Sequence, residues 1–586
     1  MNEHSSFVEL MCARAMEHGD QTALVFSADP FRPERDEILT YRSLDQAARR
    51  VAALLQARFA PGDRVLVLQP TGLGFASSFL GCVYAGMVPV AAPPPDGHRR
   101  QADRIAAIAR DADAVAALAD TTDMEALTTW AKEQDLPGFA LLDPSSEQLP
   151  LAAAWRRPPA DPDALVFLQY TSGSTSDPKG VMVDHANLLA NARLLALVLD
   201  LDSATVAGGW LPMHHDFGLI GLLLTPLILG GRSVLMPPMA FLKRPNAWLT
   251  LIDRHGIDFS PAPNFAFELA ARRATDAEIA ELDLSRWRLA VNGAEPVHAS
   301  TLEGFARRFA AAGLSPTAPL PGYGMAETTL VVSGDRPGRH PVITPVDPAA
   351  LERGELAPPA DGATARRLVS CGPAEVLDII VVDPDSGRML PDGRVGEIWV
   401  RGPNVARGYW RRPEETALVF DVTTADGDPG YLRTGDLGIL HEGELYVTGR
   451  IKELIIVRGR NLYPQDLEAV TRTAHPALER GVGAAFSVPV PEEEVVIVRE
   501  CRERDPAELA RVAEAVRDRL SRECGVNAQG IVLVRPGRVA RTSSGKIQRR
   551  LVREQFLRGD LTPVHAELSP SVRANLPAVK TGRTAS

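Results

Sequence analysis

The chain has 586 residues, of which 45% are hydrophobic and 23% charged, and its formal net charge is −11. This composition is ordinary for a soluble globular protein, and at about 100–200 residues per domain the length predicts three or four structural units. The acidic balance argues against nucleic acid as a general partner.

Cysteine usage and apolar runs bear on the cellular compartment. The five cysteines are odd in number and form no CxxC pair, so we expect a reduced, intracellular protein without structural zinc. The opening residues, MNEHSSFVEL, lack a basic start followed by an apolar run, and we expect no signal peptide. The longest uncharged apolar run, residues 217–231, is shorter than the roughly 18–20 residues of a membrane span. It predicts a buried helix or strand–loop–helix in a cytoplasmic protein without stable membrane insertion.

Residues 1–160 alternate helical and extended patterns. Apolar residues at helical spacing predict helices at 39–59 and 74–86, and short apolar runs predict strands at 63–70 and 87–95. The same extended texture recurs in ALVFLQYTSGS, RSVLMPP, FSPAPN and LAVNGAEP. Strands that alternate with helices predict an α/β domain with a largely parallel sheet.

The pattern changes beyond residue 370. Residues 377–402 and 443–464 are β-rich and predict a smaller antiparallel or barrel-like subdomain. Residues 505–537 predict a small α+β unit, and the polar, proline-containing stretch after about residue 565 predicts a disordered tail.

A Gly/Ser/Thr-rich loop follows a predicted buried strand in LQYTSGSTSDPKGV, residues 168–181. Backbone amides and hydroxyls in such a loop can converge on a phosphate. It is not a Walker loop, because Lys179 precedes Gly180 and Val181 stands where Ser or Thr is required. The alternative is a plain turn. A second glycine pattern, TGLGFAS at 71–77, is a weak dinucleotide fingerprint, because Ser77 occupies its last glycine position.

Polar residues gather in several other turns. WLPMHHDFGLIG, residues 210–221, could suggest a metal site, but a histidine satisfied beside an apolar pocket is favoured. NGAEPV and GYGMAETTL place an aromatic ring where a flat base could stack, and the carboxylate of Glu327 suits Mg²⁺. In YLRTGDLG, Asp436 can accept two ribose hydroxyls, and Arg450 and Lys546 supply positive charge for phosphates.

Together these stretches resemble the adenylate-forming superfamily of acyl-CoA synthetases, peptide-synthetase adenylation domains and luciferases. The resemblance spans about residues 20 to 560, with the motifs in family order. It is strongest to the fatty acyl-AMP ligases, in LQYTSGST, WLPMHHDFGLIG, YGMAETTL and especially IVRGRNLYPQDLE. It implies a large N-terminal domain of two α/β sheet subdomains and a β-barrel-like subdomain, with a small mobile C-terminal α+β domain.

The resemblance also implies domain limits and an insertion. We expect the N-terminal adenylation domain at 1–451, the mobile domain at 452–565 with Lys452 at the hinge, and the tail at 566–586. The stretch 333–370 is long for an acyl-CoA synthetase, and in acyl-AMP ligases an insertion there hinders the rearrangement that uses CoA. By composition alone it is a Pro/Ala-rich surface loop, and long structureless loops are often functional.

The implied reaction needs ATP and Mg²⁺. A fatty acid carboxylate attacks the α-phosphorus of ATP, and the acyl group then passes to the phosphopantetheine thiol of an acyl carrier protein on another chain. Lys546, Glu327, His215 and Thr171 are the implied catalytic residues, and Glu327 holds the metal. The pyrophosphate loop is implied to comprise Thr171, Ser172, Gly173, Ser174, Thr175 and Lys179, and the nucleotide is implied to contact Ala294, Glu295, Pro296, Tyr323, Gly324, Met325, Ala326, Asp436, Arg450 and Lys546.

Two alternatives stay open at this stage. An acyl-CoA synthetase of the same fold would transfer the acyl group to CoA. A non-catalytic acyl-adenylate-binding protein would bind its ligand without catalysing either step. The residues do not give the acyl chain length, the carrier or the oligomeric state. We expect the walls of the acyl pocket around Phe217, Met239, Phe241 and Phe265.

Overall fold

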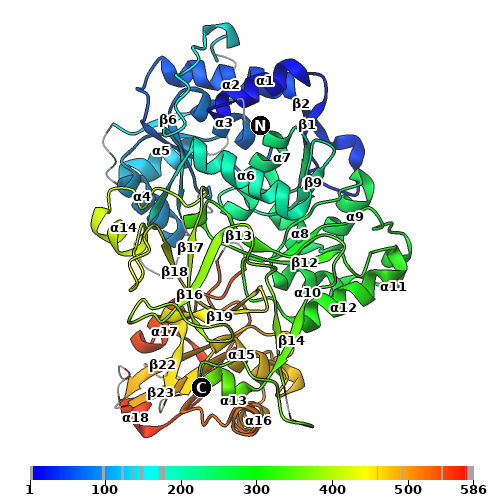
Figure 1. Ribbon diagram of the computed structural model, residues 1–586, viewed down its shortest axis with the longest axis vertical. Helices are drawn as coiled ribbons and strands as arrows, with labels where there is room; N and C mark the ends of the chain where they lie inside the picture. Colours follow the sequence, from blue (N-terminus) through cyan, green and yellow to red (C-terminus); the bar gives the residue numbers. More distant parts are fainter. Residues whose placement is uncertain are drawn as a thin grey trace, which may run out of the picture.

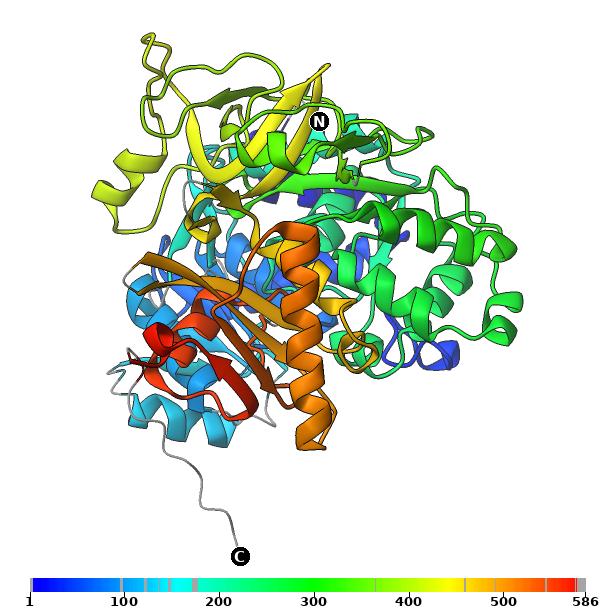
Figure 2. The same ribbon diagram turned by 90° about the horizontal axis from the view of Figure 1, so that it is seen from below.

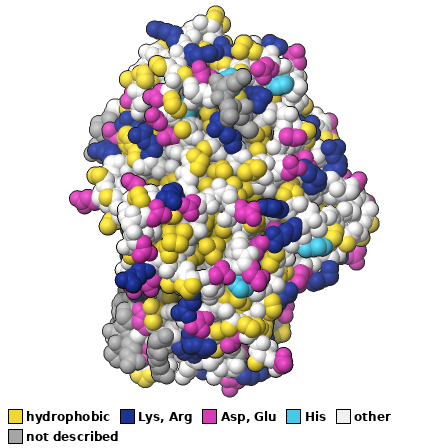
Figure 3. Space-filling model, viewed as in Figure 1, with side chains coloured by type: hydrophobic (Ala, Val, Ile, Leu, Met, Phe, Trp, Pro, Cys, Tyr) yellow, Lys and Arg dark blue, Asp and Glu magenta, His cyan; other side chains and the backbone are white. Residues whose placement is uncertain are grey.

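A computed structural model describes residues 4–94, 99–120, 124–134, 136, 138–145, 149–170, 178–363, 365–457, 460–490, 492–542, 545–574 and 576. A large body formed by residues up to about 450 occupies the upper two thirds of Figure 1, and a smaller unit lies beneath it. On the face in Figure 3, acidic and basic side chains lie interspersed, and hydrophobic side chains gather near the middle. None of the described helices combines the length and apolar character that crossing a bilayer requires.

The first α/β sheet of the large body has six strands in the order β6-β5-β3-β4-β7-β8, all parallel except for β8. The strands are β3 (Arg64–Val67), β4 (Val88–Ala91), β5 (Ala114–Leu118), β6 (Ala140–Leu142), β7 (Leu165–Tyr170) and β8 (Gly180–Asp184). Residues 171–177, between β7 and β8, lie outside the described residues, and these include the predicted phosphate-loop residues Thr171 to Thr175.

The second α/β sheet has the order β2-β1-β10-β9, and single bridges through Phe259 and Ala262 connect it to β11-β12-β13. The strands are β1 (Thr22–Phe26), β2 (Glu37–Thr40), β9 (Val206–Gly209), β10 (Arg232–Leu235), β11 (Ala290–Asn292), β12 (Pro319–Gly324) and β13 (Val331–Gly334). Two α/β sheets therefore build the large body, as predicted.

Helices cover these sheets, and their ends carry recognisable caps. Thr40 caps the amphipathic helix α2 with a capping box. The helices are α1 (Phe7–Glu17), α2 (Tyr41–Gln56), α3 (Leu73–Tyr84), α4 (Arg99–Ala112), α5 (Met124–Glu133), α6 (His185–Leu199), α7 (Thr225–Leu229), α8 (Pro238–Lys243), α9 (Asn246–His255), α10 (Asn264–Arg273), α11 (Asp276–Ala280) and α12 (Ala299–Phe309). The apolar run at 217–231 forms a buried π-type helix, η4 (Phe217–Leu224), followed by α7, which confirms the expected buried helix.

The β-rich part is an antiparallel sheet in the order β16-β17-β18-β19. Its strands are β16 (Asp378–Val382), β17 (Gly396–Arg401), β18 (Leu432–His441) and β19 (Glu444–Arg450), and helix α14 (Pro413–Val419) lies in the connection from β17 to β18. Strand β19 ends at Arg450, and a 3-10 turn, η7 (Ile451–Glu453), carries Lys452 into the smaller unit.

The stretch 333–370 corrects the expectation of a structureless loop. It forms the hairpin β14 (Ile343–Val346) and β15 (Arg366–Val369) with helix α13 (Pro348–Glu352) between the strands. Val346, Leu351 and Leu368 share a buried core with residues of β18 and β19. The Pro/Ala-rich composition hid this structure, because only a few apolar residues in the stretch supply its core.

The smaller unit is built on the sheet β22-β23-β24-β25 with a two-stranded ribbon, β20-β21. Figure 2 shows the long helix α16 lying across this unit. The elements are β20 (Ile455–Val457), β21 (Arg460–Leu462), β22 (Gly483–Val490), β23 (Glu492–Glu500), β24 (Gly530–Val534), β25 (Pro563–Leu568), α15 (Pro464–Arg472), α16 (Pro506–Cys524), α17 (Arg549–Arg558) and α18 (Pro570–Ala574).

Strand β25 and helix α18 show that the tail prediction is wrong for residues 566–574. Strand β25 completes the sheet by pairing antiparallel with β24, and Val572 of α18 is buried against the same unit. The polar, proline-containing sequence suggested disorder because β25 is an edge strand with few apolar residues. Residues 577–586 lie outside the described residues.

Candidate active site

A cavity of about 940 Å³ lies where the large body, the β-rich sheet and the smaller unit meet. Its size suits a small-molecule site. The predicted site residues that the structure describes all line it, together with Lys452 of the turn after β19. They are Lys179, His215, Ala294, Glu295, Pro296, Tyr323, Gly324, Met325, Ala326, Glu327, Asp436, Arg450 and Lys546.

Three residues at one end of the cavity are already hydrogen-bonded to one another. The hydroxyl of Tyr323 donates to Asp436 Oδ2 at 2.7 Å, and Arg450 Nε donates to Asp436 Oδ1 at 2.8 Å. Asp436 is buried, and its carboxylate raises the pKa of Arg450 above the ordinary value. The result is a fixed acidic acceptor beside an aromatic ring, which is an arrangement suited to a nucleoside.

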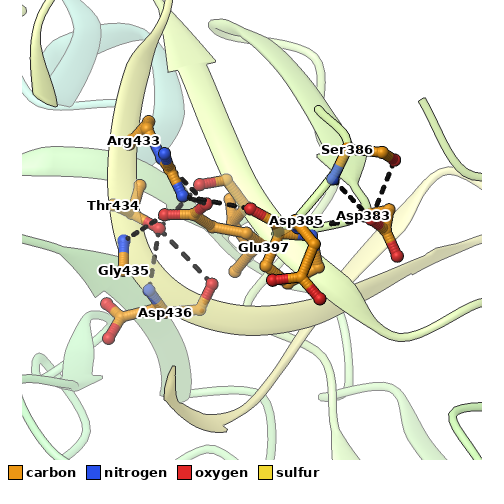
Figure 4. A network of polar contacts seen from close by, with 10 residues as sticks. Asp383, Asp385, Ser386, Glu397, Arg433, Thr434, Gly435 and Asp436 are labelled. Carbon is orange, nitrogen blue, oxygen red and sulfur yellow. Dashed lines mark hydrogen bonds and ion pairs between the residues drawn. The ribbon is translucent and has the colours of Figure 1, made fainter. Parts of the chain in front are cut away.

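Asp436 lies in β18 where the pairing with β17 is irregular, and Figure 4 shows the hydrogen bonds that hold this part of the strand. Arg433 Nη2 donates to Glu397 Oε2 at 2.8 Å, and the amide of Gly435 donates to the other oxygen of Glu397 at 3.1 Å. The hydroxyl of Thr434 accepts from the amide of Asp436 at 3.1 Å. Gly435 has a φ of +70°, a conformation that glycine adopts without a steric penalty.

The loop after β11 also lines the cavity. Ala294 lies in the left-handed region with a φ of +67°, so the loop turns sharply at the cavity. Glu295 Oε1 accepts from the amide of Phe265 at 2.6 Å. Burial raises the pKa of Glu295 to about 7, although the Phe265 amide and the charge of Lys546 both favour the ionised form.

A second group of polar residues surrounds the ring of Tyr409. The Tyr409 hydroxyl donates to Glu327 Oε1 at 2.9 Å, and the Lys179 ammonium lies 5.2 Å from the ring centroid. Burial raises the pKa of Glu327 above its ordinary value, against the effect of the Tyr409 hydroxyl. Lys179 also forms an ion pair with Glu415 on α14. Lys179 thus lies over the Tyr409 ring, and Glu327 is held by the hydroxyl of the same residue.

Glu327 is the described residue best placed to hold a cation. Its carboxylate lines the cavity, and hard cations such as Mg²⁺ prefer oxygen ligands. Among the described residues there is no cluster of three or more His, Cys, Asp or Glu side chains that could bind a metal on its own. A cation at Glu327 would therefore need further oxygen ligands from a bound phosphate and from water.

The two adjacent histidines, His214 and His215, are both half-buried, and His215 lies beside an aspartate. His215 Nδ1 lies 2.6 Å from Asp216 Oδ1, and Asp216 also accepts from the amide of Phe217 at 2.7 Å. Burial would raise the pKa of Asp216, but His215 and Lys546 outweigh this effect and lower the pKa. Burial lowers the pKa of His214 to about 3. The His214 side chain is half-buried and also lines the cavity.

Lys546 reaches the cavity from the smaller unit. It follows Gly545, whose backbone lies so close to Phe265 that a Cβ there would lie 2.6 Å from the ring. Burial lowers the pKa of Lys546, whereas the carboxylates of Asp216, Glu295 and Asp436 favour its charged form. Arg472 of α15 forms an ion pair with Glu268 of α10 at 2.9 Å, which ties the smaller unit to the large body.

Sequence reasoning missed Asp216, Tyr409 and Glu415. Asp216 could have been found from its position next to His215, whereas Tyr409 and Glu415 belong to a region, RGYWRRPEET, that has no local chemical signal. The expected acyl-pocket walls need correction as well. Phe217 lines the cavity, but Phe241 stacks on Trp210 at 4.1 Å within the core, and Met239 is exposed.

The α/β body, the small C-terminal unit and a cavity between them that is suited to a nucleoside are features of the AMP-binding enzymes. The model of the AMP-binding enzyme family matches residues 12–410. The chain belongs to the AMP-binding enzyme family. Several relatives that match nearly its whole length are named as fatty-acid ligases. One is the medium-chain-fatty-acid–[acyl-carrier-protein] ligase JamA of Moorena producens, 40% identical over 89% of this chain and 90% of the relative.

Another relative and two solved structures are also named as fatty-acid AMP ligases or fatty acyl-adenylate ligases. The long-chain-fatty-acid–AMP ligase FadD26 of Mycobacterium bovis is 37% identical over 94% of this chain and 97% of its own. The crystal structure of the fatty acid AMP ligase from Legionella pneumophila superposes with a TM-score of 0.75 at 35% identity, covering 97% of this chain and 98% of that chain. A fatty acyl-adenylate ligase structure from a study of the Escherichia coli and L. pneumophila enzymes gives a TM-score of 0.86 at 32% identity, covering 94% and 98%.

Proposed function

We propose that this protein activates a fatty acid with ATP to form acyl-AMP and pyrophosphate. It then transfers the acyl group to the phosphopantetheine thiol of a separate acyl carrier protein. The observation that supports the first step best is the single cavity that joins Lys546 of the smaller unit to Tyr323, Asp436, Glu327 and Lys179 of the large body. The names of the relatives support the acid and the carrier as substrates.

The residues suggest one orientation of ATP. Asp436 accepts the ribose hydroxyls, Arg450 lies beside it, and Tyr323 and the loop of Ala294, Glu295 and Pro296 flank the adenine. The triphosphate then extends toward Lys179 and Glu327. Mg²⁺, when bound at Glu327, supplies charge neutralisation for the phosphate oxygens.

In the adenylation step, one carboxylate oxygen of the acid forms a bond to the α-phosphorus, and the bond from that phosphorus to pyrophosphate breaks. The carboxylate is already a nucleophile, so catalysis consists of positioning and charge neutralisation. In this proposal the acid carboxylate binds beside His215, and Lys546 contacts oxygens of both the carboxylate and the α-phosphate; both residues line the cavity. In this proposal the acyl chain lies against apolar cavity residues of α6 and of the start of β13, namely Leu195, Val198, Leu330 and Val331.

In the transfer step, the thiol attacks the acyl carbonyl, and AMP leaves. The segment at 333–370 bears on which thiol has access. Glu352 of α13 forms an ion pair with Arg460 at 2.8 Å, and Arg366 of β15 forms one with Asp466 at 2.8 Å and lies over the ring of Tyr463. These contacts tie the smaller unit to the 333–370 segment, which itself packs on β18 and β19, and they favour a carrier-dependent ligase over an acyl-CoA synthetase.

Two assays test the proposal. The first measures acid-dependent exchange of pyrophosphate into ATP over a panel of fatty acids of increasing length, and we expect exchange only when an acid is present. The second measures thioester formation with a phosphopantetheinylated carrier and, separately, with CoA. Efficient acyl-CoA formation would make the protein an acyl-CoA synthetase, and no exchange with any acid would leave a binding protein.

The role of the 333–370 segment is tested better by point substitutions than by deletion, because deletion would expose the core shared by Val346, Leu351 and Leu368. Glu352→Gln combined with Arg366→Gln removes both ion pairs and leaves that core intact. We expect CoA-dependent thioester formation to rise in the double variant while acyl-AMP formation is unchanged. Absence of any rise in a folded variant would contradict the blocking role.

A further inference from the structure

The lysine expected to contact pyrophosphate already has an anionic partner in the structure. Lys179 lines the cavity, yet its ammonium is paired with the carboxylate of Glu415, in the first turns of α14. The charge of Lys179 lowers the pKa of Glu415 below its ordinary value, so this carboxylate stays ionised. A bound pyrophosphate and Glu415 would therefore compete for the same ammonium group.

Glu415 is held in reach of Lys179 by Arg412. Arg412 Nη1 lies 3.0 Å from Glu415 Oε1, and Arg412 Nη2 lies 2.9 Å from Asp111 Oδ1 and donates to the carbonyl of Pro178 at 3.4 Å. The hydroxyl of Tyr170 donates to the other oxygen of Asp111 at 2.6 Å. The start of α14 is thus linked to both residues that flank positions 171–177.

The Lys179–Glu415 pair is suited to exchange because it is not buried. The Lys179 side chain is 27% exposed and the Glu415 side chain is 36% exposed. Ion pairs at such positions stabilise a protein weakly, because water and salt screen them. A pyrophosphate with several negative charges can therefore displace Glu415, and Glu415 can regain the ammonium when pyrophosphate leaves.

We propose that Glu415 is a positioning residue that competes with the phosphates of the substrate for the Lys179 ammonium group. By taking back this ammonium group after adenylation, Glu415 favours pyrophosphate release. This inference rests on the proposed function, because pyrophosphate is a product only of adenylation. Lys179 leaves Glu415 when ATP binds and contacts the phosphates until the bond at the α-phosphorus breaks. It then returns to Glu415, whose negative charge opposes retention of the product.

Direct binding of pyrophosphate tests this without requiring turnover. Titration calorimetry with magnesium pyrophosphate compares the wild type, Glu415→Gln and the control Glu414→Gln, which removes the same charge from the exposed neighbour. The side-chain oxygen of glutamine can still accept a hydrogen bond from Arg412, so the contact that positions residue 415 is kept. We expect Glu415→Gln to bind pyrophosphate about two- to fivefold more tightly, and the control to match the wild type. Unchanged or weaker binding in Glu415→Gln, or an equal gain in the control, would overturn the inference.

A double-mutant cycle shows whether the gain acts through Lys179. In a Lys179→Ala background, Glu415→Gln should leave the dissociation constant unchanged, because the shared ammonium is gone. Tighter pyrophosphate binding by Glu415→Gln in the Lys179→Ala background would contradict the proposed competition for Lys179. Failure of this inference differs from failure of the proposed function. Acyl-AMP formation with no effect of Glu415 contradicts only the exchange, whereas pyrophosphate binding without acyl-AMP formation contradicts only the adenylation.

Discussion

The two ends of the cavity hold their charges in different ways. At the end assigned to ribose, Asp436 has a side-chain exposure of 5% and accepts from both Tyr323 and Arg450. At the end assigned to phosphate, Lys179 and Glu415 form one ion pair that is partly open to water. The first end is preorganised, and the second can change partners. This difference suits a reaction that retains AMP through both steps and releases pyrophosphate after the first.

The largest expected effect concerns Lys546, which the smaller unit supplies to the cavity. Lys546→Ala should lower acyl-AMP formation by about 10²–10³-fold, which corresponds to ~2.7–4 kcal/mol, because its charge is useful mainly in the transition state. The dissociation constant of ATP should change little, since Asp436 and Lys179 remain. Single-turnover acyl-AMP formation and ATP calorimetry measure the two quantities. Acyl-AMP formation at the wild-type rate would remove Lys546 from the mechanism.

The preorganised end should be sensitive to loss of its carboxylate. Asp436→Asn should weaken ATP binding by roughly 10–100-fold, because hydrogen bonds to a charged group contribute ~1.5–3 kcal/mol. Tyr323→Phe serves as the matched control, since it removes one neutral donor and should weaken binding by only about fivefold. Calorimetry with ATP compares them. Equal effects of the two substitutions would mean that the charge of Asp436 is not what binds the ribose.

The pH dependence should report the buried lysine. Burial lowers the pKa of Lys546, so its charge is present at low pH and is lost, as pH rises, earlier than for an ordinary lysine. Acyl-AMP formation should therefore fall by about tenfold per pH unit above that pKa. Lys546→Arg should be slower but lack this alkaline decline, because guanidinium stays charged. The same decline in both proteins would point to another group.

A smaller effect is expected at Tyr409, whose hydroxyl donates to Glu327. Tyr409→Phe keeps the ring that packs on Phe420 but removes the hydroxyl bonded to Glu327. We expect the Mg²⁺ concentration for half-maximal exchange to rise about two- to tenfold, because Glu327 loses its orienting donor. A titration of pyrophosphate exchange with Mg²⁺ measures the shift. An unchanged Mg²⁺ requirement would argue against Glu327 as the metal-binding carboxylate.

The sequence predicted the elements that have strong local signals. The helix at 39–59 and the strands at 63–70 and 87–95 were found because hydrophobic period and buried runs are local properties. The hairpin of β14 and β15 and the edge strand β25 were missed, because each takes its stability from a neighbouring sheet rather than from its own residues.

The site follows the same division. Asp436, Glu327 and Lys546 lie in glycine-containing stretches of the sequence, and each could be named from sequence and resemblance. Tyr409 and Glu415 could not, because their importance depends on contacts with Glu327 and Lys179, which lie 82 positions and more than 200 positions earlier in the chain, respectively. Only the folded chain brings such partners together.

The central claim is that one cavity, completed by Lys546 of the smaller unit, joins a fatty acid to AMP. The most direct test is a single turnover of the wild-type protein with ATP, Mg²⁺ and a fatty acid, without carrier or CoA, with products identified by mass spectrometry. The account predicts acyl-AMP and pyrophosphate in equal amounts, both dependent on the acid. Release of ADP and phosphate, or no acyl-AMP with any acid of the panel, would contradict it.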